Sequence, residues 1–160
     1  MLTLQFICIG SLKEKYWREA CAEYEKRLRP FCRPQILELP EERLPEHAGE
    51  AEIAAAVEAE GKRILSKAAE RSYFIPLCIE GKQMDSPALS RLFEEIALHG
   101  YSTISLVIGG SYGLSDTVKQ AGRTCLSMSK MTFPHQLARV MLLEQVYRAF
   151  MISSHAKYHK

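Results

Sequence analysis

The chain has 160 residues, of which 47% are hydrophobic and 25% are charged. These proportions are those of an ordinary globular protein of one domain, and they exclude a disordered chain, a collagen-like chain and a pure coiled coil. The formal net charge of +2 gives no reason to propose a nucleic-acid-binding protein, but residues 119–160 carry seven Lys and Arg against one acid, Glu144. Residues 1–118 carry 14 Lys and Arg against 18 Asp and Glu, so the C-terminal part of the chain is basic.

Apolar runs alternate along the chain with stretches whose apolar residues have helical spacing. In chain order, the pattern predicts a strand over 2–9, a helix over 13–28, a strand over 35–39, an acidic surface loop over 41–49 and a helix over 51–69. It then predicts a strand over 73–79, a helix over 85–98, a strand over 103–108, a helix over 115–124, a short strand over 126–128 and a long helix over 136–152. Asp85 and Ser115 are residue types that cap the first turn of a helix. Strands that alternate with helices predict an α/β fold with a mainly parallel sheet flanked by helices.

The cysteine pattern favours free thiols in a reducing cytosol. The cysteines are odd in number, none forms a C-x-x-C pair, and no cluster of Cys and His has the spacing of a zinc site. Residues 1–10 are apolar but short, with no positive residue before them, which is typical of a strand rather than a signal peptide. No apolar run reaches the roughly 18 residues that predict a membrane-spanning helix. We therefore expect a cytoplasmic protein that binds no metal and no membrane.

Three segments that follow predicted strands are candidates for a ligand site, because ligands of parallel α/β sheets bind beyond the carboxyl ends of the strands. They cover residues 77–82, 107–113 and 128–135. The second holds Gly109, Gly110 and Gly113, and glycine lets a backbone approach a ligand closely, although an ordinary tight turn explains the pattern equally well. It matches neither the P-loop nor the G-x-G-x-x-G pattern, which disfavours binding driven by phosphates.

The third segment combines hydroxyl-bearing residues with methionine and aromatic residues. Ser129 and Thr132 offer hydroxyls next to backbone amides and carbonyls, which suits a neutral, partly polar ligand such as an adenosine. The alternative is an ordinary loop that Pro134 and His135 close at the start of the last helix. No Ser-His-Asp order and no paired carboxylates stand out, so the sequence does not support a hydrolase.

The last predicted helix is apolar over much of its circumference, which indicates burial on more than one side. We interpret this as the interface of a two-fold homodimer, with the central helix of a monomer as the alternative. Arg139 and Arg148 lie on opposite faces of this helix, and Arg148 is placed to pair with Glu144 one turn earlier. The tail that follows contains Tyr158 and His159, which suit phosphate contact and base stacking; a frayed, solvated end is the alternative.

Six segments of the chain resemble one family in sequence and in order. They are Gly-Ser-Leu-Lys-Glu-Lys-Tyr-Trp at 10–17, Glu-Tyr-Glu-Lys-Arg-Leu at 23–28, Val-Ile-Gly-Gly-Ser-Tyr-Gly-Leu at 107–114, Leu-Ser-Met-Ser-Lys-Met-Thr-Phe-Pro-His at 126–135, Glu-Gln-Val-Tyr-Arg-Ala at 144–149 and Tyr-His-Lys at 158–160. Nearly from end to end, the chain resembles the small methyltransferases of the SPOUT superfamily that methylate N3 of a pseudouridine in large-subunit ribosomal RNA.

This resemblance implies a SPOUT-type α/β knot, in which part of a single domain over 1–160 forms a deep C-terminal trefoil knot, at about residues 73–160. It implies a homodimer joined through the knotted part, and S-adenosyl-L-methionine as the cofactor bound by the loops of the knot. The residues that correspond to the family's adenosyl site are Leu77, Gly109, Met128, Ser129, Lys130, Met131, Thr132 and Phe133. The substrate implied is a pseudouridine in the 23S ribosomal RNA of the assembled ribosome.

Our candidates for the chemistry are two residues near the start of the last helix and two in the tail. His135 and Arg139 share one face, from which a cation can stabilise the anion that forms when an imide nitrogen loses its proton. Tyr158 and His159 would complete the site from the other subunit of the dimer. Two alternatives stay open at this point: a non-catalytic α/β protein that binds a nucleotide or RNA, and a SPOUT methyltransferase that acts on another RNA such as tRNA.

Overall fold

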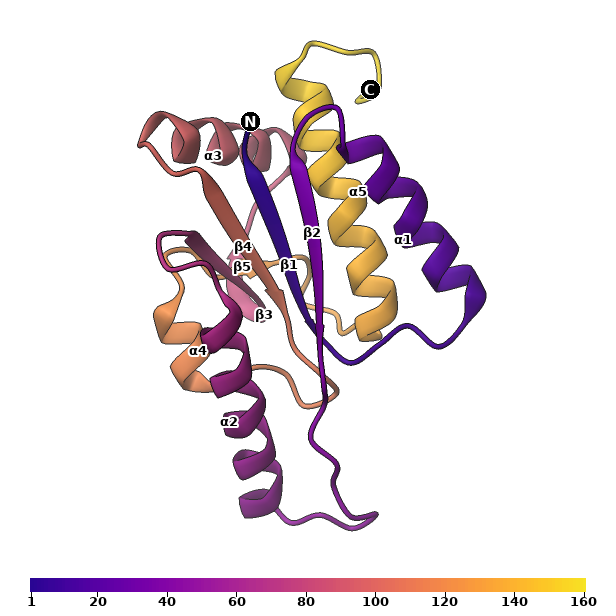
Figure 1. The fold of residues 1–160 in the computed structure, drawn as a ribbon, viewed down its shortest axis with the longest axis vertical. Helices are drawn as coiled ribbons and strands as arrows, with labels where there is room; N and C mark the ends of the chain where they lie inside the picture. Colours follow the sequence, from indigo (N-terminus) through magenta and orange to yellow (C-terminus); the bar gives the residue numbers. More distant parts are fainter.

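The computed structural model describes all 160 residues. Its strands are β1 (Thr3–Ile9), β2 (Arg33–Leu39), β3 (Tyr73–Gln83), β4 (Thr103–Ile108) and β5 (Leu126–Ser127), and its helices are α1 (Lys15–Leu28), α2 (Glu50–Lys67), α3 (Ser86–Leu98), α4 (Asp116–Ala121) and α5 (His135–Ser153). All strands are parallel, in the order β2-β1-β4-β3-β5, and helices cover both faces of the sheet (Figure 1). The predicted α/β fold with a parallel sheet is therefore confirmed, with every predicted strand and helix present. No helix is both long and apolar enough to span a membrane.

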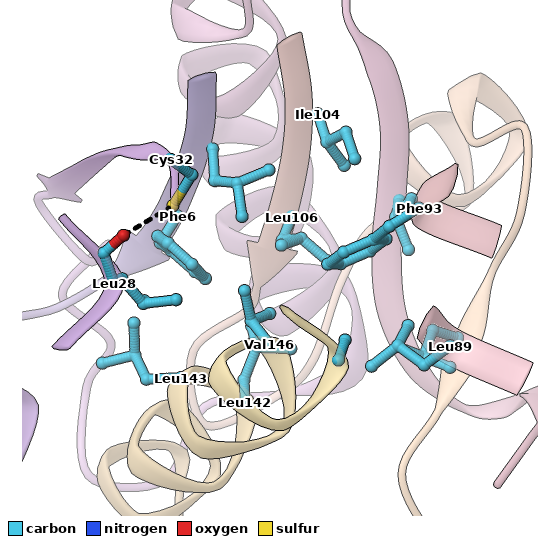
Figure 2. Close-up of a cluster of buried hydrophobic side chains, with 14 of the residues drawn as sticks. Phe6, Leu28, Cys32, Leu89, Phe93, Ile104, Leu106, Leu142, Leu143 and Val146 are labelled. Atoms are coloured by element: carbon cyan, nitrogen blue, oxygen red, sulfur yellow. Dashed lines mark hydrogen bonds between the residues drawn. The ribbon is translucent and has the colours of Figure 1, made fainter. Parts of the chain in front are cut away.

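The strands bury their two faces against two groups of helices, because successive side chains of a strand point to opposite sides of the sheet. On β1, Phe6 and Cys8 belong to the core under α1, α3 and α5, whereas Ile7 and Ile9 belong to a smaller core under α2 and α4. Figure 2 shows the larger core, where side chains from the sheet, α3 and α5 converge. Full burial of one such side chain stabilises the fold by about 1.5–3 kcal/mol. The resulting three layers hold the carboxyl ends of the strands at one edge (Figure 1).

β3 is longer than predicted, because it continues past residue 79 to Gln83. The register shifts along the way, so that both Leu77 and Lys82 pair with Leu126 of β5. The added residues, 80–83, are not apolar, so the apolar pattern that predicts strands did not include them. It is nevertheless fixed by the backbone, since the amide of Lys82 donates a hydrogen bond to the carbonyl of Cys125 at 2.7 Å.

α4 is shorter than predicted and ends at Ala121 rather than at residue 124. The amide of Arg123 donates to the carbonyl of Phe74 at 3.0 Å, and this bond ties the chain to β3 where the helix would have continued. Both predicted caps are confirmed: the side chain of Ser115 accepts an amide hydrogen bond in the first turn of α4, and that of Asp85 does the same for α3.

Candidate functional site

A cavity of about 800 Å³ lies at the carboxyl edge of the sheet. We call it the first cavity; its walls are the ends of β3 and β4, the segments that follow β4 and β5, and the start of α5. Eleven of its 21 lining residues are hydrophobic, so the lining combines apolar side chains with polar groups. A volume within about 300–1,000 Å³ and a mixed lining of this kind are typical of sites for small organic ligands.

The glycine-rich segment after β4 forms one wall of the first cavity as a tight turn. Gly110 and Gly113 pair with each other, and the amide of Gly113 donates to the carbonyl of Gly110 at 3.0 Å. Gly109 lies directly against this turn, because a Cβ atom at Gly109 would stand 2.7 Å from the carbonyl oxygen of Gly113. The segment is therefore the tight turn that was expected, since it closes only without a side chain, and its backbone lines the cavity.

The loop between β5 and α5 forms another wall. The hydroxyl of Ser129 accepts a hydrogen bond from the amide of Met131 at 3.0 Å, which fixes the loop, while Met131 is 74% exposed. Seven of the eight residues that the family resemblance assigns to the cofactor line the first cavity: Leu77, Gly109, Met128, Ser129, Met131, Thr132 and Phe133. The eighth, Lys130, is exposed and does not line it.

An ion pair between Lys119 of α4 and Glu80 of β3 belongs to the lining of the first cavity. The hydrogen bond from Lys119 lowers the pKa of Glu80, and the same bond raises the pKa of Lys119. Both groups are partly exposed, so the pair contributes little to stability, but it balances the two charges at the wall of the cavity. Lys119 is not among the residues predicted from the sequence, because a lysine at a polar position of a helix gives no signal of its own.

The two predicted residues near the start of α5 have different surroundings. His135 is half-buried, lines the first cavity and makes no side-chain hydrogen bond within the chain, so its ring nitrogens are free for a ligand. The side chain of Arg139, one turn further on, is only 3% exposed and does not line the cavity. Its guanidinium donates to Oε2 of Glu38 at 2.7 Å and to the carbonyl of Gly10 at 3.2 Å. Arg139 therefore joins α5 to the ends of β1 and β2.

The predicted residues of the tail lie against the second half of α5. The hydroxyl of Tyr158 donates to Oε1 of Glu144 at 3.2 Å, and its ring centroid is 4.9 Å from that of Tyr147. Arg148 pairs with Glu144 as predicted, and its guanidinium stands 4.8 Å from the centre of the Tyr158 ring and 3.4 Å from Nδ1 of His159. Burial, followed by the charge of Glu144, raises the pKa of Tyr158. The tail is therefore folded onto α5, at least as far as His159, rather than frayed.

The predicted site residues thus form two groups that one chain does not bring together. α5 has 19 residues, which corresponds to a length of about 28 Å. His135 is its first residue, whereas the residues that hold the tail lie in its second half. Figure 1 shows the tail at the end of the molecule where β1 begins, opposite to the carboxyl ends of the strands.

A second cavity, of about 420 Å³, lies beside the first. It is bounded by the segments that follow β1 and β2 and by the start of α5, and only one of its ten lining residues is hydrophobic. Ser111 and His135 line both cavities, so the two meet at these side chains. The second cavity was not predicted from the sequence, because Lys13 and Glu38, which line it, have the pattern of ordinary surface charges.

These features define a three-layered α/β protein with a ligand-sized cavity at the carboxyl edge of its parallel sheet. The model of a family described as "Predicted SPOUT methyltransferase" matches residues 2–159. The chain therefore belongs to the SPOUT methyltransferase family, and the resemblance seen in the sequence is confirmed.

Curated relatives match over nearly the whole length of the chain. A protein named "Ribosomal RNA large subunit methyltransferase H" from Leuconostoc mesenteroides subsp. mesenteroides is 48% identical over 159 residues, which are 99% of this chain and 100% of that protein. A protein of the same name from Streptococcus agalactiae serotype III is 47% identical over the same shares of both chains.

Two solved structures share the fold at low sequence identity. A probable methylase family protein from Haemophilus influenzae Rd KW20 gives a TM-score of 0.56 at 14% identity, with 98% of this chain and 70% of that chain covered. A probable methyltransferase from Bordetella pertussis Tohama I gives a TM-score of 0.53 at 12% identity, with 91% and 95% covered. At these identities the likeness concerns the fold alone.

Proposed function

We propose that this chain is an enzyme that transfers a methyl group from S-adenosyl-L-methionine to N3 of a pseudouridine in 23S ribosomal RNA, within the assembled ribosome. The observation that carries the proposal is the first cavity, because seven of the residues that the family resemblance assigns to the adenosyl group line it together. The names of relatives that are 44–48% identical to this chain support ribosomal RNA of the large subunit as the substrate.

The lining of the first cavity fits this cofactor. Leu77, Leu126 and Met128 offer apolar surface to an adenine ring, and the backbone of the glycine turn and of the 128–133 loop offers amides and carbonyls to its polar edge. Lys119, which also lines the cavity, is paired with Glu80, so its charge does not oppose a sulfonium. When bound, S-adenosylmethionine supplies an electrophilic methyl group.

The residues of the chain have two tasks in this reaction, to position the base and to take its proton. N3 of the base is an imide nitrogen between two carbonyls, and it becomes a strong nucleophile only when its proton leaves. His135 is the residue placed to accept this proton, because its half-buried ring lines both cavities and has a free nitrogen. Arg139 acts as a positioning residue, since it fixes Glu38 and the carbonyl of Gly10 behind His135.

A homodimer is part of the proposal, with the tail of one subunit at the first cavity of the other. Within one chain the tail lies against the second half of α5, far from the cavity at the start of that helix. Val140, Tyr147 and Phe150 on α5 are only partly buried in the single chain, which leaves apolar surface for a second copy to cover. Such a dimer would also combine two basic C-terminal segments, which favours contact with RNA phosphates.

Removal of residues 158–160 is expected to lower methyl transfer by about tenfold or more, because base stacking and phosphate contacts are lost. Binding of S-adenosylmethionine, measured by calorimetry, should change by no more than about twofold. The Lys67→Ala variant, which removes an exposed charge at the end of α2 and keeps the tail, is the matched control. Full methyl transfer by the shortened chain contradicts the role of the tail.

A mixing experiment separates action across the dimer from action within one chain. The heterodimer combines a His135→Ala chain with a tail-deleted chain. If the tail acts across the interface, the intact His135 of the tail-deleted chain meets the intact tail of the other chain, and one site is complete. If the tail acts within its own chain, both sites lack one component. We expect mixing to restore about half of the wild-type activity per heterodimer, because one of two sites is complete. Native mass spectrometry confirms that heterodimers form, and inactive heterodimers contradict action across the interface.

Cys78 lines the first cavity, and its labelling tests where the cofactor binds. Burial, followed by the neighbouring Cys125 thiol, raises the pKa of Cys78 to about 11. Below this pKa, we expect the rate at which iodoacetamide labels Cys78 to rise about tenfold for each unit by which the pH is raised, because only the thiolate reacts. S-adenosylhomocysteine should slow this labelling, as peptide mass spectrometry would record. Burial raises the pKa of Cys8 in the core to about 12, and Cys8 should stay unlabelled throughout.

The direct test is incubation of the purified chain with S-adenosylmethionine that carries a labelled methyl group. Assembled ribosomes, isolated large subunits and tRNA are offered separately, and the labelled nucleoside is identified by digestion and mass spectrometry. We expect N3-methylated pseudouridine in 23S RNA. Label in tRNA would support a tRNA methyltransferase instead, and cofactor binding without transfer to any RNA would support a non-catalytic binding protein. The trefoil knot over about 73–160 stays a prediction of the family resemblance, and the single domain over 1–160 and the cytoplasmic location stay predictions from the chain length and the cysteine pattern.

A further inference from the structure

The second cavity lies outside the residues assigned to the cofactor, yet it borders the first cavity directly. We propose that the second cavity is the acceptor pocket, which takes the target nucleotide with its base next to His135 and its carbonyl and N–H groups on the polar lining. This inference rests on the proposed function and deepens it, because it assigns recognition of the base to the segments that follow β1 and β2.

The position of the second cavity is the first argument. Methyl transfer requires the acceptor nitrogen at about 3–3.5 Å from the methyl carbon, in line with the bond that breaks. An acceptor pocket must therefore share a boundary with the cavity that holds the donor, and Ser111 and His135 form this boundary. A volume of about 420 Å³ also suits one nucleotide that has been turned out of its stack, as enzymes that modify bases require.

The chemistry of the lining is the second argument. Its polar side chains include those of Ser11, Lys13, Glu38, Glu41 and Gln136. A base of the uracil type presents carbonyl acceptors and N–H donors along one edge, so it needs both donors and acceptors from the protein. Serine hydroxyls, the glutamine amide and the lysine ammonium supply the donors, and the carboxylates supply the acceptors.

Glu38 offers a carboxylate oxygen that is already aligned and still free. Its Oε2 accepts hydrogen bonds from Arg139 at 2.7 Å and from the amide of Leu12 at 3.3 Å, whereas Oε1 makes no hydrogen bond within the chain. A pseudouridine has one more ring N–H than a uridine, because its ribose is attached to carbon. A site that hydrogen-bonds this extra N–H rejects an analogue that lacks it, and Oε1 of Glu38 is the acceptor for it.

The pocket keeps its shape without a ligand, which is the third argument. Oε2 of Glu60 accepts the amide of Glu42 at 2.8 Å, and the Arg63 guanidinium donates to the carbonyl of Pro40 at 2.9 Å. These bonds hold the segment after β2 against α2. A site that is fixed before binding loses less conformational entropy when the nucleotide enters.

Gly10 opens the space that this arrangement requires. It has a φ of +88°, and a Cβ atom there would stand 3.7 Å from Nε2 of His135 and 3.9 Å from Oε2 of Glu41. The imidazole and the carboxylate therefore face the same space next to the glycine. A base in that space has a proton acceptor on either side.

The Ser11→Phe variant tests the proposal by filling the pocket from its wall. Ser11 is exposed, lines only the second of the two cavities and makes no side-chain hydrogen bond, so the change should not disturb folding. We expect kcat/KM for ribosomes to fall by about tenfold or more, while the dissociation constant for S-adenosylmethionine changes by no more than about twofold. Ser66→Phe, at an exposed position on α2, is the matched control. Wild-type kcat/KM in the Ser11→Phe variant would overturn the proposal.

A binding measurement decides the same question without catalysis. Pseudouridine 5′-monophosphate is titrated into the full chain with S-adenosylhomocysteine present, and amide shifts are followed by NMR. We expect shifts at Ser11, Lys13 and Gln136 that disappear in the Ser11→Phe variant. Shifts confined to residues of the first cavity, or no shifts at millimolar nucleotide, overturn the acceptor pocket. If the wild-type chain methylates no RNA, the proposed function fails, and this titration alone still decides whether the pocket binds the nucleotide.

Discussion

The Gly109→Ala variant is expected to bind S-adenosylmethionine about tenfold or more weakly than the wild-type chain. A Cβ atom at this position would stand 2.7 Å from the carbonyl oxygen of Gly113 and 2.8 Å from its carbonyl carbon. These are backbone atoms that no rotamer change moves, so the turn that forms the wall of the first cavity must shift as a unit. Forcing a methyl group into a space of this kind costs about 1–3 kcal/mol, and about 1.4 kcal/mol corresponds to a tenfold change in affinity.

Isothermal titration of both chains with S-adenosylmethionine measures this effect. Gly49→Ala is the matched control, because Gly49 has a φ of −76° and a Cβ atom there would meet nothing nearer than 4.0 Å. The control should bind as the wild-type chain does and lose about 0.5–1 kcal/mol of stability, because Gly49 is the N-cap of α2 and alanine is a poorer N-cap residue than glycine. Equal affinity of the Gly109→Ala and Gly49→Ala variants would show that the glycine turn is not part of the cofactor site.

The parts of the fold that the sequence predicted well are those whose stability comes from local patterns. β1 and β4 are mostly apolar, and α3 begins at a capping aspartate, so hydrophobicity and capping alone locate them. The predicted end of β3 was wrong because the last residues of this strand are polar. They are held by the hydrogen bond from the amide of Lys82 to the carbonyl of Cys125, a partner 43 positions away in the chain. Such a bond leaves no mark on the local sequence.

In the candidate site, too, the residues that local patterns mark were predicted, and those that distant parts of the chain bring together were not. Gly109 and the 128–133 loop follow strands directly, so the rule on carboxyl ends of strands was enough to find them. Glu38 and Lys13 are charged residues in unremarkable surroundings, and only the parallel pairing of β1 and β2 brings the segments that contain them together beside His135. The buried state of Arg139 likewise depends on a carboxylate of β2 and on the carbonyl of Gly10, which directly follows β1.

The ion pair of Arg139 and Glu38 leads to a prediction that reverses the usual order of substitution effects. Changes at buried residues normally cost more than changes at exposed ones, and the Arg139 side chain is 3% exposed while that of Glu38 is 42% exposed. The cost of breaking an ion pair, however, depends on the charge that is left behind. Removal of Glu38 leaves a guanidinium with almost no access to water, whereas removal of Arg139 leaves a carboxylate that water already reaches.

We therefore expect Glu38→Leu to lower the free energy of unfolding by about 3–5 kcal/mol, because a buried charge loses its partner. Arg139→Met keeps an unbranched apolar side chain in the core and should cost only about 1–2 kcal/mol, mainly for the carbonyl of Gly10, which loses its donor. The double variant should be more stable than Glu38→Leu alone, since it removes the stranded charge. Urea unfolding of all three variants at one protein concentration measures these values. If Arg139→Met proves the more damaging single change, then packing of the arginine stem, and not the desolvated charge, determines the stability of this edge of the sheet.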